Sequence, residues 1–220
     1  FAGCELLPCS TASAASGAAT SRVNRAMRHP SIDLLRTIAL VVMVVVHFAE
    51  NLSGVIPPIT GLGAPLFTFL SGLSYRLWLN GQLARDKSED EISKVSIRRG
   101  LFVFGIGMAF NVLVWLPEDT YNWDVLTFIG IALLALSGLR RLPLPVVALV
   151  AALSLLASPV LRHLADYNAY WSKGYFQGEL TLTDQLIGLL ATGYFPVFPW
   201  ICYSATGFVI GSILFGGESD

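Results

Sequence analysis

Six apolar stretches, each long enough or nearly long enough to cross a lipid bilayer, dominate this sequence of 220 residues. A spanning helix needs about 20 mostly apolar residues, and shorter ones are tolerated when their ends reach the interface. Because lipid offers no partner for free backbone groups, each stretch is expected to be helical. The sequence therefore predicts an all-α polytopic membrane helix bundle, with spans at residues 32–49, 62–79, 101–116, 125–139, 143–161 and 195–215.

Two other segments are not predicted to span. Residues 182–194 are apolar but too short, so they either lie at the membrane interface or extend the last helix. Residues 1–28 are rich in small residues, contain three arginines and lack the apolar core of a signal peptide. We therefore expect a disordered cytoplasmic tail at 1–28, followed by one transmembrane domain at 29–220.

The basic residues alternate along the chain in the way that sets membrane orientation. Lys and Arg favour the cytoplasmic side of short loops. Most of the 14 Lys and Arg precede the first span or lie between spans two and three and between spans four and five, whereas connections 50–61 and 117–124 contain none. This pattern predicts an even number of crossings with both termini in the cytoplasm, and we expect a bacterial inner membrane.

Composition and motifs exclude several classes of function. Only 13% of the residues are charged, against about 25% in soluble domains, and a net charge of −1 with no basic stripe argues against nucleic-acid binding. The three cysteines are scattered, which favours neither a disulfide scaffold nor a metal site. No phosphate-binding loop, dinucleotide fingerprint, zinc motif or nucleophile elbow is present.

The first span contains the most informative polar residues. Arg36 and His47 are eleven residues apart, so they lie on one helix face, about 16 Å apart along the axis. Asp33 precedes Arg36 by three residues and can pair with it. An Arg suits a phosphate and a His suits a general base, so this face fits a phosphate-bearing ligand from the cytoplasm. The alternative is that Arg36 reaches the interface beside Asp33 and that His47 only marks the helix end.

Further candidates are weaker. Arg98 and Arg99 open the third span and suit phosphates, although residues that only set topology look the same. Arg76, in the last turn of the second span, is expected to reach the interface. Asn111, inside the third span, is expected to form a hydrogen bond between helices.

Small residues and prolines indicate how the helices pack. Pro65 suits the first turn of the second span, and Ser71 and Gly72 permit close approach of a neighbouring helix. Pro199, beside Trp200 and following another proline at 196, predicts a bent or broken start to the last span. Such breaks occur where membrane proteins build cavities.

Three blocks of this sequence resemble the transmembrane acyltransferases, most closely the bacterial relatives of heparan-α-glucosaminide N-acetyltransferase. They are SIDLLRTIAL at 31–40 followed by His47, APLFTFLSGLS at 64–74, and FPWICYSATG at 198–207 around the Pro199–Trp200 pair. An Arg and a His separated by ten residues also match the acyltransferase-3 group. The sequence departs at Thr37, where the family usually has Gly, and the family usually has more than six helices. The chain thus resembles the N-terminal part of a longer protein or a reduced member.

The resemblance implies an acyl-CoA donor bound from the cytoplasm, a carbohydrate acceptor on the far side of the membrane, and no metal. His47 would be the general base or a transient acyl carrier. Arg36, held by Asp33, would contact the donor's phosphates or orient its pantetheine channel, and Arg98 and Arg99 would bind the same donor.

Two alternatives remain open. One is a transporter or channel component in which Arg36 and His47 line an anion or proton path, and the other is a non-catalytic structural subunit. A homo-oligomer is compatible with each.

Overall fold

The computed structural model describes residues 29–54, 58–114, 123–168 and 182–216, and all the regular elements among them are helical. In chain order these elements are α2 (Pro30–Ser53), α3 (Thr60–Leu83), α4 (Glu89–Val114), α5 (Val125–Leu139), α6 (Leu144–Leu164), α8 (Leu182–Ile187), the π-helix η1 (Gly188–Thr192) and α9 (Val197–Phe215). The tail predicted at 1–28 lies outside the described residues.

The six predicted spans correspond to α2, α3, α4, α5, α6 and α9, and the all-α membrane bundle is confirmed. Several helices are longer than their apolar stretches. α4 begins at Glu89, twelve residues before the predicted span, with three acidic residues in its first turn. These carboxylates favour the positive end of the helix dipole, so the polar first turns of α4 remain helical beyond the apolar part.

Not every spanning helix is strongly apolar along its length. Among the described residues, the helices long and apolar enough to cross a membrane are Pro30–Ala49, Glu89–Leu113, Leu144–Leu164 and Val197–Phe215, and Val125–Leu139 is shorter. α3 is not among them, because it contains Gly, Ser, Thr and Asn on faces that are buried against other helices. A helix that is enclosed by protein needs less apolar surface than one that faces lipid.

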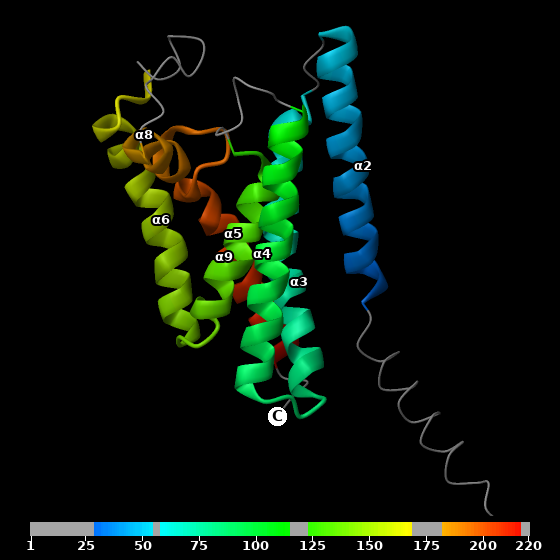
Figure 1. The fold of residues 1–220 in the computed structure, drawn as a ribbon. Coiled ribbons are helices and arrows are strands. Elements are labelled where there is room, and N and C mark those ends of the chain that lie inside the picture. The colour runs from blue at the N-terminus through cyan, green and yellow to red at the C-terminus, as the bar shows by residue number, and fades with distance from the viewer. Residues whose placement is uncertain (1–28, 55–57, 115–122, 169–181, 217–220) are drawn as a thin grey trace, which may run out of the picture.

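The helices alternate in direction (Figure 1). We call the end where α2 begins and α9 ends the proximal end, and the opposite end the distal end. α2, α4 and α6 run from proximal to distal, and α3, α5 and α9 return. The rings of His29 and Phe215 meet at the proximal end with centroids 4.4 Å apart. His29 is thus packed against the end of α9.

Two glycines bring α3 and α9 into backbone contact. A Cβ at Gly72 of α3 would overlap the carbonyl oxygen of Ser204, and a Cβ at Gly207 of α9 would overlap the carbonyl oxygen of Phe69. The hydroxyl of Ser204 donates a hydrogen bond to the carbonyl of Thr68 at 3.0 Å, directly across this contact. The close approach expected at Gly72 is therefore present, and its partner is α9.

Glycines also bring the backbones of α4 and α5 into close contact. A Cβ at Gly107 would collide with the backbone of Thr127, and one at Gly130 would collide with that of Phe104. α6 packs on α9, and α2 lies at the edge of the bundle, where it packs mainly on α3 (Figure 1). The pairs enclose two apolar clusters, one around Leu136 and Phe208 and one around Phe128 and Ile201.

The last span starts with the break that its prolines predict. Phe198 has non-helical dihedral angles (φ −101°, ψ 119°), and its bond to Pro199 is cis. Trp200 packs on Phe195 and Tyr203, with ring centroids 4.8 and 5.6 Å away. Residues 182–194 do not extend this helix, because α8 and η1 end before an extended Gly193.

Pro65 lies deeper in its helix than the sequence suggested. α3 begins at Thr60, so Pro65 lies in the second turn rather than the first, and the earlier placement is wrong. Proline there removes one helical hydrogen bond, to the carbonyl of Gly61. Gly61 is exposed, so the carbonyl is not trapped in a dry core.

The α3–α9 contact yields a stability prediction. Gly72→Ala and Gly207→Ala are each expected to destabilise the protein by about 1–3 kcal/mol, the usual cost of overpacking. Gly105→Ala is the matched control, because a Cβ there meets nothing within 4 Å. Thermal unfolding in detergent measures the effect, and a wild-type Tm in both core variants would contradict the backbone contact.

Candidate functional site

A cavity of about 180 Å³ lies between α2, α3, α4 and α5, toward the proximal end. Its walls come from the first turns of α2, the middle and second half of α3, the first half of α4 and the middle of α5. The residues that line it are Arg36, Phe67, Leu70, Ser71, Ser74, Tyr75, Trp78, Ser96, Arg99, Ile129 and Leu133.

Two arginines from different helices border this cavity. Arg36 comes from α2 and Arg99 from α4. The Arg36 guanidinium lies 3.5 Å from the carboxylate of Asp33, as the spacing predicted, and about half of its side chain is exposed. The Arg99 guanidinium lies over the Trp78 ring, 5.1 Å from its centroid. Two cationic groups that border one hollow suit an anion with more than one negative charge.

Hydroxyl groups form the wall between the arginines. The Tyr75 hydroxyl and the Ser96 hydroxyl share a buried hydrogen bond of 2.8 Å. Ser71 donates to the carbonyl of Thr68 at 2.6 Å and lies 3.3 Å from the Ser204 hydroxyl. The Ser74 oxygen is buried and has no hydrogen-bond partner among the described residues. The wall thus offers a donor or acceptor to a bound molecule.

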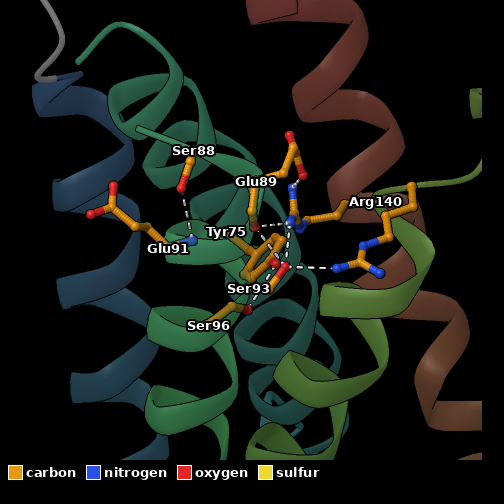
Figure 2. Close-up of polar contacts among 8 residues, drawn as sticks. Tyr75, Ser88, Glu89, Glu91, Ser93, Ser96 and Arg140 are labelled. Atoms are coloured by element: carbon orange, nitrogen blue, oxygen red, sulfur yellow. Dashed lines mark hydrogen bonds and ion pairs between the residues drawn. The ribbon is translucent and has the colours of Figure 1, made fainter. Parts of the chain in front are cut away.

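An ion-pair cluster at the proximal end fixes α4 against α5 (Figure 2). Arg140, whose side chain is only 3% exposed, pairs with Glu89 at 2.7 Å and donates to the Ser93 hydroxyl at 2.8 Å. Arg141 donates to the same hydroxyl at 2.8 Å. Ser93 lies one turn before Ser96, so this cluster sets the position of the part of α4 that reaches the cavity. Sequence reasoning had assigned Arg140 and Arg141 to topology alone.

His47 lies near the distal end of α2, is exposed, and is not among the residues that line the cavity. Its neighbourhood includes Asp124, which caps the start of α5 by accepting a hydrogen bond of 2.6 Å from the Val125 N–H. Burial raises the pKa of the Asp124 carboxyl, while that hydrogen bond and the charge of a protonated His47 oppose the rise. The catalytic role of His47 stays a prediction.

The other predicted site residues, apart from Ser71, do not line the cavity. Arg98 is exposed and does not line the cavity, because one residue turns it about 100° from Arg99. Asn111 is fully buried in α4, and its hydrogen bond between helices stays a prediction. Gly72, Pro65, Pro199 and Trp200 shape the helices rather than the cavity wall.

Sequence reasoning singled out three of the eleven lining residues, Arg36, Ser71 and Arg99, and missed the other eight. Four of the eight have a side-chain O–H or N–H group, and only the helical spacing of residues in α3 and α4 contained a signal for them. These are Ser74, Tyr75, Trp78 and Ser96. In the part of the chain that the structure describes, no group of three His, Cys, Asp or Glu side chains is placed to hold a metal ion.

One comparison with known proteins is informative. The family described as heparan-alpha-glucosaminide N-acetyltransferase, catalytic, matches residues 28–219. Searches of the curated proteins and of the solved structures find no match. The match covers all six spanning helices, the cavity and His47. This chain therefore belongs to the heparan-α-glucosaminide N-acetyltransferase catalytic family.

Proposed function

We propose that this protein is a membrane-bound acyltransferase that transfers an acetyl or other acyl group from cytoplasmic acyl-CoA to a carbohydrate on the opposite side of the membrane. Its membership of an N-acetyltransferase family supports the reaction type. The observation that carries the proposal is the cavity bordered by Arg36 and Arg99. In this proposal the proximal end faces the cytoplasm.

The distribution of charge supports that orientation. The connections at the proximal end and the helix turns beside them contain most of the basic residues of the described chain. These are Arg85, Lys87, Lys94, Arg98, Arg99, Arg140 and Arg141. Positive residues of short loops favour the cytoplasm, where acyl-CoA is available. An anionic donor would thus meet a basic surface before it reaches the two cavity arginines.

The size of the cavity limits what it holds. Pockets for drug-sized ligands usually measure about 300–1,000 Å³. A cavity of about 180 Å³ is smaller, so it accommodates one part of a coenzyme rather than all of it. Phosphates suit the arginines and hydroxyls, and the pantetheine arm would then extend along α2 toward His47, about 16 Å further along the helix axis.

The proposed reaction needs one general base at the distal end, where the carbohydrate would bind. The acceptor's amine or hydroxyl attacks the thioester carbonyl, a C–N or C–O bond forms, and the C–S bond breaks. His47 takes the proton from the attacking group and returns it to the departing thiolate. In the covalent variant, the imidazole first receives the acyl group and then passes it to the acceptor.

The donor site can be tested by binding. Arg99→Ala and Arg36→Ala are each expected to weaken acetyl-CoA binding about 10- to 100-fold, because a hydrogen bond to a charged group contributes about 1.5–3 kcal/mol. The measurement is the thermal shift of the detergent-solubilised protein as acetyl-CoA is titrated. Lys94→Ala is the control, since Lys94 is exposed on the same helix and does not line the cavity. Wild-type affinity in both arginine variants would exclude this cavity as the donor site.

His47 is tested by turnover. His47→Ala is expected to lower acyl transfer about 10²- to 10⁴-fold while the protein still inserts and binds acetyl-CoA, because loss of a general base has effects of this size. His163→Ala, an exposed histidine at the distal end of α6, serves as the control. Wild-type transfer by the His47 variant would rule out the proposed role. Anion or proton flux in proteoliposomes without acyl-CoA would instead favour the transporter.

A further inference from the structure

A carboxylate is fixed at the start of α5. Asp124 has extended backbone angles (φ −74°, ψ 163°), and its side chain accepts the 2.6 Å hydrogen bond from the N–H of Val125. One carboxylate oxygen is therefore used as a helix cap, and the second remains for another partner. The side chain is partly buried, so a positive neighbour would stabilise its charge.

At this level of the bundle, α2 lies beside an apolar cluster to which α5 contributes. Met43 of α2 packs on the apolar cluster that contains Val125, Phe128 and Ile129 of the first turns of α5. His47 follows Met43 by four residues, so it projects from the same face of α2, one turn nearer the distal end. Asp124 directly precedes Val125 in the same direction. The Met43 contact thus brings this part of α2 to the cluster that begins at Val125, and the Asp124 carboxylate lies close enough to His47 for their charges to interact.

Few other ionisable groups of the described residues lie on the helices around this point. On α2, residues 37–48 contain none besides His47. Residues 60–74 of α3, residues 100–114 of α4 and the whole of α5 contain none. Glu50 follows His47 by three positions, and its side chain is outside the described set. Asp124 is therefore the described carboxylate that α5 presents to His47.

We propose that Asp124 is a positioning residue for His47. Its carboxylate would orient the imidazole and stabilise the imidazolium that forms when His47 accepts a proton from the attacking amine or hydroxyl. Asp124 itself keeps its negative charge throughout and exchanges no proton, as in other histidine–carboxylate pairs. This inference rests on the proposed function for its catalytic consequence, and on the Met43 contact and the fixed Asp124 cap for the pair itself.

Two substitutions separate the charge from the helix cap. Asp124→Asn and Asp124→Ser remove the carboxylate, but Asn and Ser both cap helices. Each is expected to lower kcat at least about tenfold with the KM for acetyl-CoA unchanged, because the donor arginines lie at the other end of α2. The acidic limb of the pH–rate profile is expected to move to lower pH, since loss of an anion disfavours imidazolium. Asp166→Asn, an exposed aspartate after α6, is the control.

A second measurement does not depend on acyl transfer. In a His29→Gln, His163→Gln background, diethyl pyrocarbonate modifies His47 as the remaining histidine, and its rate is followed against pH. The pH at half-maximal rate is expected to fall in both Asp124 variants, even if the protein transfers no acyl group. A half-maximal pH that stays at the wild-type value in both variants overturns the pair, as does a shift produced by Glu50→Gln and by neither Asp124 variant.

Discussion

The backbone contact between α3 and α9 is the interaction on which the rest of the bundle depends. In lipid there is no hydrophobic drive to bring helices together, so close packing must do it, and Gly72 and Gly207 remove the Cβ atoms that would prevent it. α3 in turn supports α2 on one side and faces α5 on another, and its middle and second half supply Ser71, Ser74, Tyr75 and Trp78 to the cavity. A wider α3–α9 spacing would displace that whole wall. The candidate site is therefore a consequence of how two helices approach each other, rather than of any single side chain.

Much of the fold could be predicted because lipid imposes simple rules on a chain. The lengths of the apolar stretches located all six helices, and the Gly72 and Pro199 patterns predicted a close approach and a broken helix that the structure contains. Helix neighbours could not be predicted, because nothing local relates Trp78 to Arg99 or Glu89 to Arg140. For the same reason, Arg98 and Arg99 looked equivalent in sequence, and only the rotation of α4 separates them. Pro65 was misplaced because polar Thr60 and Gly61 hid the true start of α3.

Charge is distributed unequally between the two ends of the bundle. At the proximal end, Arg36 and Arg140 each have an exposed carboxylate partner, Asp33 and Glu89, while Arg99 rests on an aromatic ring. The described proximal turns contain more basic than acidic residues, so the proximal end retains a positive field. At the distal end, the described turns of α3, α4 and α5 contain no ionisable group, and the charges of His47 and Asp124 interact there. In the proposed function, the proximal end would attract the anionic donor, and the distal end would hold the one histidine that accepts a proton.

The stacking of Arg99 on Trp78 has a consequence for the strength of binding. An indole face attracts a guanidinium without taking any of its five N–H groups, so the contact itself consumes no hydrogen-bonding capacity. It also restricts a long side chain before any ligand arrives. Ordering such a side chain upon association usually costs about 0.5–1.5 kcal/mol, and here part of that ordering belongs to the empty protein. In the proposed donor site, the ring would thereby preorganise Arg99 and strengthen binding of the donor without an added contact.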